Sequence, residues 1–146
     1  LWLVSGGARS IVAQGLLAPG CVRLTYDQGQ LIVCSPHGRM AHLFTLNTDG
    51  TLANSAPFFR LNLSGDETDS GAGQADAHPK GWSCFATRLG LQLADANGLI
   101  SAIIPLPSGR PAVGVAFGAP EAGMLWASCG KRIYRRRIAS PDHLWF

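Results

Sequence analysis

The stretch Trp82–Arg137 decides the fold of this chain, and its sequence is WSCFATRLGLQLADANGLISAIIPLPSGRPAVGVAFGAPEAGMLWASCGKRIYRRR. Short apolar segments alternate here with turn residues. Asn97-Gly98 lies between two such segments and is a strong hairpin signal, because both central residues of a type I′ turn need positive φ. Strands at this spacing predict an all-β protein. The expected strands are Ser83–Thr87, Gly90–Ala94, Leu99–Pro105, Ala112–Phe117, Met124–Ser128 and Lys131–Arg137.

The composition supports the same fold class. The chain has 146 residues, of which 47% are hydrophobic and 14% charged, so it can build a core and is unlike a disordered chain. Its 18 glycines and 9 prolines suit a fold with many turns and disfavour a helical bundle. We therefore expect one all-β domain over residues 1–146.

Strands are also predicted in the first half of the chain. Alternation of apolar and polar residues and the turn residues between them indicate a hairpin followed by a series of extended segments. The expected segments are Leu1–Val4, Arg9–Ala13, Cys21–Tyr26, Gln30–Cys34, Met40–Leu46, Thr51–Ala53 and Pro57–Leu63.

A repeat connects the two halves. Leu31–Cys34, Ser83–Ala86 and Leu125–Ser128 are equivalent apolar segments, each followed by a small turn and a second strand. They recur at intervals of about 40–50 residues, the range of four-stranded propeller blades. A β-sandwich is the competing architecture, but it does not require such regular repetition. We predict a partial propeller of about three blades, with Leu1–Ala13 as outer strands of a preceding blade and with apolar faces left open at its ends.

The segment Ser64–Lys80, SGDETDSGAGQADAHPK, differs from the rest because it is polar and acidic. We expect a long loop there, and long loops in compact domains are often functional. Its acidic cluster Asp66, Glu67 and Asp69 could attract a cation, although a solvated loop is the simpler interpretation.

The basic residues gather near the C-terminus, although the net charge is only +3. Arginines alternating outward around Ile133 on a last strand explain the cluster more simply than nucleic-acid binding, because no set of stacking aromatics accompanies it. We expect no nucleic-acid partner. The cluster comprises Lys131, Arg132, Arg135, Arg136 and Arg137.

The four cysteines are Cys21, Cys34, Cys84 and Cys129. None forms a C-x-x-C pair, which disfavours a zinc or thioredoxin-type site. Buried free thiols are the simplest expectation. A disulfide between Cys21 and Cys34 on neighbouring strands is left open by the sequence.

No stretch reaches the roughly 20 apolar residues of a membrane span. The chain has no initiator Met, and Leu1–Val4 resembles the middle of a strand, so we expect a fragment. The sequence leaves the compartment open between the cytoplasm and the periplasm or exterior of a bacterium.

Several segments together carry a family resemblance. Phe85–Gln92 is similar to a "VATxxGxQV" strand pair, and Asp95–Pro105 to a "DxxGxxxxIP" hairpin. In order and spacing, the residues from Gly15 to Ile138 resemble the C-terminal part of the gluconolactonase family, which also contains senescence marker protein and luciferin-regenerating enzyme. The other matching segments are Pro19–Leu24, Asp49–Leu52, Pro57–Leu61, Val115–Gly118, Leu125–Gly130 and Ile133–Arg135.

The resemblance implies a six-bladed β-propeller, the remaining blades lying upstream of Leu1. It implies a metal-dependent hydrolase of sugar lactones, with a small-molecule lactone as partner. A divalent cation (calcium, magnesium or zinc) would polarise the lactone carbonyl and activate water. The alternative is a non-catalytic binding or structural propeller that has lost its metal ligands.

The alternative is motivated by the glycines at two of the family's metal-ligand positions in this chain. The resemblance places a metal-binding Asn at Gly20 and a metal-binding Asp, which also acts as the base, at Gly73. A further Asp falls at Ser35 and a further Asn at Gly114, and an N-terminal Glu ligand would lie upstream. Glycine offers no side-chain oxygen to a hard cation.

Nearby polar residues could substitute for the missing ligands. Asp69 and Asp76 are the candidate metal ligands, and His78 lies in the same segment. Asp76 stands three residues after Gly73, so in an extended strand its side chain would point to the opposite face. No catalytic residue is identified. Trp82 and Trp126 are better explained by blade packing than by sugar stacking.

Overall fold

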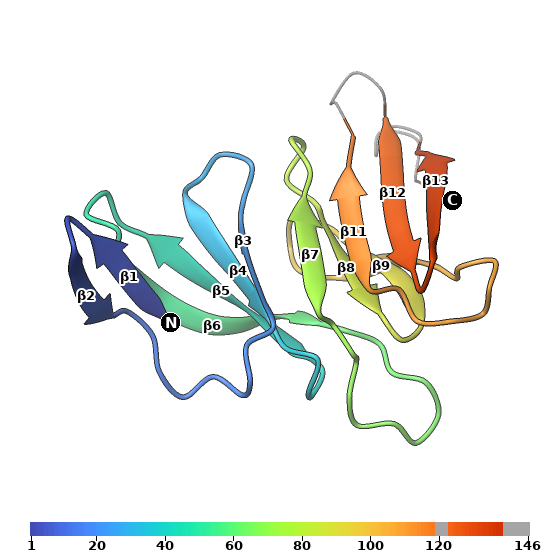
Figure 1. Ribbon diagram of the computed structural model, residues 1–146, viewed down its shortest axis with the longest axis horizontal. Helices are drawn as coiled ribbons and strands as arrows, with labels where there is room; N and C mark the ends of the chain where they lie inside the picture. Colours follow the sequence, from blue (N-terminus) through green and yellow to red (C-terminus); the bar gives the residue numbers. More distant parts are fainter. Residues whose placement is uncertain (119–122, 139–146) are drawn as a thin grey trace.

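The computed structural model describes residues 1–118 and 123–138, and in these residues the protein is all β (Figure 1). None of the described segments forms a helix long and apolar enough to cross a bilayer. The strands are β1 (Trp2–Ser5), β2 (Ala8–Ile11), β3 (Cys21–Leu24), β4 (Gln30–Cys34), β5 (Met40–Leu46), β6 (Leu52–Arg60), β7 (Gln74–Ala77), β8 (Ser83–Thr87), β9 (Gly90–Ala94), β10 (Ile100–Ile104), β11 (Gly114–Phe117), β12 (Met124–Cys129) and β13 (Arg132–Arg137).

The described strands form four antiparallel sheets, each a simple meander. β3 to β6 make the first large sheet, β7 to β10 the middle one and β11 to β13 the last, while β1 and β2 form a separate hairpin. Within each sheet, strands that follow one another along the chain pair directly, as tight turns require. The result is a partial β-propeller with two blades of four strands and one of three in the described residues. This confirms the predicted fold class.

The core lies in two layers on either side of the middle sheet. Residues on one side of β8 point to one neighbour and residues on the other side point to the other, as the alternation of a strand dictates. Phe85 packs with Ile32 and Phe59 of the first sheet. Cys84 and Ala86 pack with residues of the last sheet. Trp82 is buried in this second layer, which confirms its predicted role in blade packing.

Apolar side chains remain open to solvent at both ends of the row of sheets. Around the first sheet the exposed residues include Val22 and Tyr26, and in the last sheet Ile133 is 75% exposed. The sequence analysis predicted that Ile133 would be the inward-facing residue of the last strand, and this prediction was wrong. β13 is the last strand of its sheet in the described residues, and nearly all of it is exposed.

Three local predictions were also wrong. Leu52–Arg60 is one continuous strand with two irregularities in register, where two extended segments were expected. Asn97 does not adopt positive φ, so the turn is not type I′. Instead, the Asp95 carboxylate accepts the backbone N–H groups of Asn97 and Leu99, both at 2.9 Å, and builds a longer turn.

The third error concerns the polar segment 64–80. It is not a loop throughout, because β7 lies within it and pairs with β8 from Gln74↔Ala86 to Ala77↔Ser83. The other strand predictions hold to within a few residues at each end. β7 is the strand that positions the site described next.

Candidate functional site

The innermost strands of the three sheets, β3, β7 and β11, lie side by side. Each sheet begins at this strand (Figure 1). An ion pair joins β7 to β3, and a hydrogen bond joins it to β11. Gly20 precedes β3, Gly73 precedes β7 and Gly114 begins β11. We call this end of the three strands the glycine end. A Cβ on Gly20 would lie 3.9 Å from the Cα of Gly73, so residues 53 positions apart in sequence are neighbours here.

The three strands keep a common register. Arg23 contacts Asp76, three residues beyond Gly20 and Gly73 respectively. Asp76 in turn contacts the backbone of Phe117, three residues beyond Gly114. The positions at which the family resemblance places metal ligands are therefore brought to one end of adjacent inner strands.

The space around these glycines differs. A Cβ on Gly73 would meet only the Gly71 carbonyl oxygen, at 4.0 Å, so a side chain fits there. A Cβ on Gly20 would lie 2.9 Å from Cδ of Pro36, too close for any side chain without movement of the proline. At Gly114 the added Cβ would lie 2.5 Å from Ser128 Oγ. Ser35, the fourth position, uses its hydroxyl to accept the His37 N–H at 3.0 Å.

Asp76 is buried, with 5% of its surface exposed, and both of its carboxylate oxygens are occupied. Oδ1 lies 2.6 Å from Arg23 Nη2 and accepts the Ala77 N–H at 2.9 Å. Oδ2 accepts the Phe117 N–H at 2.7 Å. One carboxylate thus joins β3, β7 and β11, and its charge is balanced by a guanidinium.

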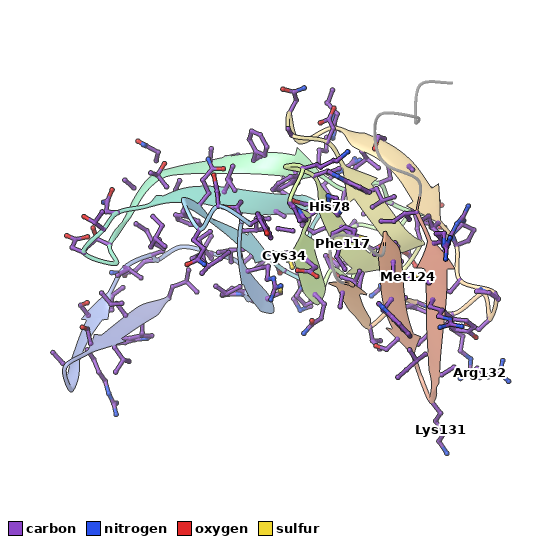
Figure 2. All side chains as sticks on the ribbon, turned by 90° about the horizontal axis from the view of Figure 1, so that it is seen from above. Cys34, His78, Phe117, Met124, Lys131 and Arg132 are labelled. Atoms are coloured by element: carbon purple, nitrogen blue, oxygen red, sulfur yellow. The ribbon has the colours of Figure 1, made fainter. Side chains whose placement is uncertain are left out.

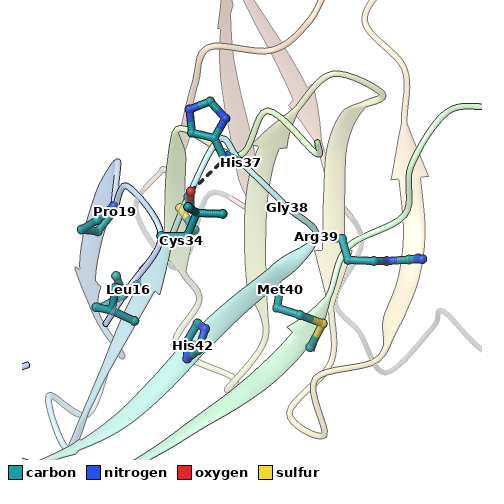
Figure 3. A pocket seen from close by; sticks show the side chains of 11 residues that line it. Leu16, Pro19, Cys34, His37, Gly38, Arg39, Met40 and His42 are labelled. Atoms are coloured by element: carbon teal, nitrogen blue, oxygen red, sulfur yellow. Dashed lines mark hydrogen bonds between the residues drawn. The ribbon is translucent and has the colours of Figure 1, made fainter. Parts of the chain in front are cut away.

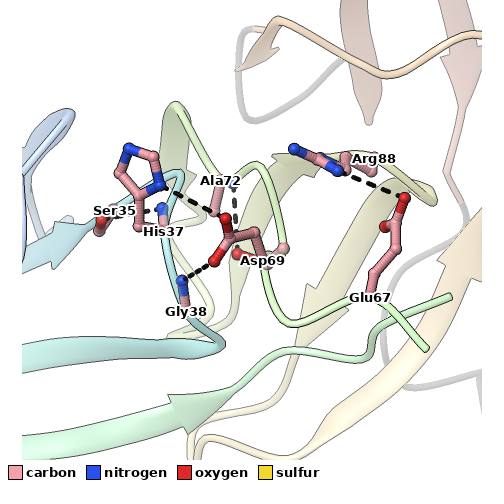
Figure 4. Close-up of polar contacts among 8 residues, drawn as sticks. Ser35, His37, Gly38, Glu67, Asp69, Ala72 and Arg88 are labelled. Atoms are coloured by element: carbon pink, nitrogen blue, oxygen red, sulfur yellow. Dashed lines mark hydrogen bonds and ion pairs between the residues drawn. The ribbon is translucent and has the colours of Figure 1, made fainter.

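Asp69 lies in the loop before β7 (Figure 4). Its side chain is 34% exposed, against 7% for that of Asp76. Its Oδ1 accepts the Gly38 N–H at 2.8 Å, and its Oδ2 lies 3.4 Å from Nδ1 of His37. The Gly38 N–H, followed by His37, holds the pKa of Asp69 below its usual range. In the same loop Glu67 pairs with Arg88 at 3.3 Å. These contacts fasten the loop to the β4–β5 turn and to β8–β9.

No cluster of three or more His, Cys, Asp or Glu side chains suited to a metal occurs within residues 1–118 and 123–138. Asp69 and Asp76 serve separate contacts: Asp69 has His37 beside it, and Asp76 is paired with Arg23. The predicted cation site at these two residues stays a prediction.

His78 lies just after β7, at the end opposite Gly73. Its ring packs against Trp82 at 4.4 Å and Phe117 at 5.0 Å between centroids. His78 and Phe117 lie close to each other beside the inner strands (Figure 2). Burial lowers the pKa of His78. A four-residue strand separates it from the glycine end by about 13 Å or more, at roughly 3.3 Å per residue.

A cavity of about 210 Å³ opens beside the first sheet (Figure 3). Its lining is mostly apolar, but His37 and His42 also border it, and Nδ1 of His42 is buried without a hydrogen-bond partner among the described residues. The sequence analysis did not single out either histidine, because the apolar residues around them gave no signal of a shared cavity.

The four cysteines are free thiols, as expected. Cys34, Cys84 and Cys129 are buried, whereas Cys21 is only partly so. Cys21 and Cys34 lie directly opposite each other on β3 and β4. No disulfide joins them in this structure.

Comparison with known proteins gives a match at the level of structure. No known family profile and no curated protein sequence matches the chain. A solved protein proposed to be a gluconolactonase superposes with a TM-score of 0.70 at 16% identity, covering 88% of this chain and 41% of its own. The chain shares the gluconolactonase fold. Its likeness to that protein is one of architecture, since identity is too low to carry an activity.

Two further solved structures agree. A gluconolactonase from Xanthomonas campestris superposes with a TM-score of 0.69 at 19% identity, covering 92% of this chain and 42% of its own. A luciferin-regenerating enzyme superposes with a TM-score of 0.65 at 13% identity, covering 83% of this chain and 40% of its own. The chain spans about two fifths of the length of these structures. They support the family resemblance through the fold, and the propeller architecture is common to all.

Proposed function

We propose that this chain is part of a gluconolactonase-like propeller that hydrolyses sugar lactones. The observation that carries the proposal is the glycine end. Gly20 and Gly73, which the family resemblance identifies with two metal-ligand positions, are neighbours in space although distant in sequence. This agreement between an expected site and an independent geometry supports descent from a lactonase propeller. The shared fold supports it as well.

The divalent cation that the resemblance implies does not fit the residues present in this chain. Gly20, Gly73 and Gly114 have no side-chain oxygen to offer. Asp76, the buried carboxylate nearest to them along the strands, already holds Arg23 and two backbone N–H groups. A guanidinium beside a cation site would also repel the cation. We therefore derive no catalytic step through a metal from these residues.

The chain's own residues make the three inner strands rigid. Asp76 links the three inner strands through an ion pair with Arg23 on β3 and a hydrogen bond from the Phe117 N–H on β11, and it is shielded from water. Buried charge-assisted hydrogen bonds fix strand positions closely. The inner strands are therefore held as a preformed wall on which a small polar ligand could bind.

The second candidate function is a non-catalytic propeller that binds a ligand or a partner. The pairing of Asp76 with Arg23 favours it, because the only buried aspartate among the described residues is committed to structure. The two candidates differ in one requirement: a metal-dependent lactonase loses activity with a chelator, whereas a binding module has no turnover to lose.

The test is hydrolysis of gluconolactone by the protein, followed with a pH indicator in calcium, magnesium or zinc and again in EDTA. Turnover that disappears in EDTA would support the hydrolase and overturn the binding module. Absence of turnover, together with a Tm that no cation raises, would overturn the hydrolase.

A variant sharpens this test. Gly73→Asp returns a carboxylate to the glycine end where space is open, whereas Gly20→Asn would collide with Pro36. We expect Gly73→Asp alone to give a cation-dependent rise in Tm if the remaining architecture of a metal site persists. Gly29→Asp is the matched control, since it adds the same charge in the exposed β3–β4 turn, beyond the end of β3 that is opposite Gly20.

A further inference from the structure

The pair Cys21 and Cys34 is placed as a disulfide would require, although the thiols are free. The two residues are register partners of the antiparallel strands β3 and β4. Directly opposed residues in such a ladder have Cα atoms about 4.5–5.5 Å apart. Disulfides span about 4.4–6.8 Å between Cα atoms, so the bond can form without moving the strands.

The surroundings of Cys21 favour its thiolate. The Ala75 N–H donates to Cys21 Sγ at 3.2 Å, and the Cys34 thiol donates a second hydrogen bond. Arg23 lies two residues on, on the same face of the strand. The Cys34 hydrogen bond, the Ala75 N–H and the Arg23 charge together lower the pKa of Cys21 to about 7, against the opposing effects of burial and of Asp76.

Cys34 has the complementary character. It is buried, and its hydrogen bond to Cys21 together with burial raises its pKa, so it stays protonated. It also forms part of the wall of the cavity beside His37 and Met40 (Figure 3). Cys21, by contrast, is only partly buried, which leaves its sulfur within reach of a small molecule. One thiol is therefore poised to react, and a second, protonated thiol lies directly opposite.

We infer that Cys21 and Cys34 form a peroxide-sensitive modification site, in which hydrogen peroxide converts the two thiols into a reversible cross-strand disulfide. The Cys21 thiolate attacks one peroxide oxygen, so an S–O bond forms, the O–O bond breaks and hydroxide leaves as water after protonation. The Cys34 thiol then loses its proton and attacks the Cys21 sulfur. The S–S bond forms, the S–O bond breaks and a second water leaves. Two electrons pass from the sulfurs to the peroxide.

Formation of the disulfide should change the contacts between strands at the glycine end. Cys21 directly follows Gly20, and its sulfur accepts the Ala75 N–H from β7. A disulfide sulfur is a weaker acceptor than a thiolate, so oxidation should weaken this link between β3 and β7. The site does not depend on lactone hydrolysis, and each idea can fail without the other.

The chain allows a clean test, because each cysteine falls on its own tryptic peptide. Cleavage after Arg9, Arg23 and Arg39 separates Cys21 from Cys34, and cleavage after Lys80 and Arg88 isolates Cys84 from Cys129. The reduced protein is treated with a small excess of hydrogen peroxide, alkylated under denaturing conditions and mapped by mass spectrometry.

We expect peptide 10–23 linked to peptide 24–39, a mass lower by two hydrogen atoms, and full reversal with dithiothreitol. The Cys34→Ser variant should instead leave a sulfenic acid on Cys21 that dimedone traps. At pH 7 iodoacetamide should alkylate Cys21 about fivefold faster than an ordinary exposed thiol, because the larger thiolate fraction outweighs its lower nucleophilicity.

The Cys84→Ala and Cys129→Ala variants are the controls, and both should form the same link. The inference is overturned by four intact thiols after peroxide, by a link that involves Cys84 or Cys129, or by dimedone labelling elsewhere than Cys21. Mapping of the unmodified sequence decides these outcomes even where a variant fails to fold. Faster amide exchange at Ala75 after oxidation would further support the link to β7, and unchanged exchange would overturn that consequence.

Discussion

The middle sheet and the last sheet have the same meander topology but very different burial. Every residue of β8 and β9 in the middle sheet is buried. In the last sheet β13 is exposed at all positions except Tyr134, which is half-buried. The middle sheet has a neighbour on each face, whereas the last sheet packs in the described residues only against the middle one. We infer that a blade of this chain is stabilised by its neighbours more than by its own strands.

The largest expected effect separates the cores of the two sheets. Phe85 on β8 is fully buried among residues of two sheets, so Phe85→Ala should lower the free energy of unfolding by about 3–5 kcal/mol. Ile133 on β13 is 75% exposed, and Ile133→Ala should change the free energy of unfolding by less than about 0.5 kcal/mol. Urea denaturation measures both. Equal losses of unfolding free energy in the two variants would contradict the difference between the two sheets.

The turns of the two sheets should differ next. Gly98 has a φ of 81°, and an added Cβ would lie 2.7 Å from the Phe58 carbonyl oxygen of the neighbouring sheet. Gly98→Ala should therefore cost about 2–3 kcal/mol, from strain and this contact. Gly130 in the last sheet has a φ of 56° but no atom nearer than 3.9 Å, so Gly130→Ala should cost about 1 kcal/mol, from the left-handed backbone alone. A larger loss at Gly130 would contradict the assigned role of the neighbouring sheet.

A smaller effect is expected from the ion pair that joins the middle sheet to both neighbours. Asp76→Asn leaves either Arg23 or the Phe117 N–H without its acceptor and should cost about 2 kcal/mol. Arg23 is half-exposed and can return to water, which keeps the loss below that of a fully buried pair. The matched change Glu67→Gln breaks an exposed pair and should cost less than about 1 kcal/mol. Equal values for the two variants would show that Asp76 does not join the sheets.

The smallest effect is a pH dependence between the middle and last sheets, where His78 packs on Trp82 and Phe117. Its pKa is lowered in the folded protein, so the unfolded chain binds more protons just below pH 6.5. Stability should therefore fall as the pH drops through 6.5 toward the folded value, and His78→Gln should remove this slope. Tm measured against pH in both proteins tests it, and identical slopes would contradict the assignment.

Much of the fold could be predicted because the buried strands carry continuous apolar segments. Ser83–Thr87 and Gly90–Ala94 were predicted to the residue, as were Gln30–Cys34 and Met40–Leu46. In these strands the hydrophobic pattern and the turns point to the same structure. The repeat of such segments then indicated the propeller.

β7 could not be predicted because its residues, Gln74–Ala77, are small or polar. Their burial depends on partners distant in sequence: Asp76 is neutralised by Arg23, and its second oxygen is satisfied by the backbone of β11. A local pattern cannot show that an acidic residue has such partners. An acidic residue flanked by alanines, in a segment just before a strongly predicted strand, was the signal available.

The glycine end was anticipated in part. The family resemblance identified Gly20 and Gly73, and the structure brings them together. The sequence could not reveal that Pro36 closes the space at Gly20 while Gly73 remains open, because these contacts arise only when the β4–β5 turn folds over the inner strands. The pairing of Cys21 with Cys34 was one alternative, and the strand register decides that they face each other.

Native-state hydrogen exchange, resolved by residue, tests most directly whether neighbours stabilise the blades. We predict that amides of β8 and β9 exchange only through global unfolding, while those of β13 exchange through local opening, about a hundredfold faster or more. Phe85 and Ala86 in β8 and Tyr134 in β13 are suitable reporters. Equal protection of β13 and β8 would contradict the account, because the last sheet would then be as stable as the sheet covered on both faces.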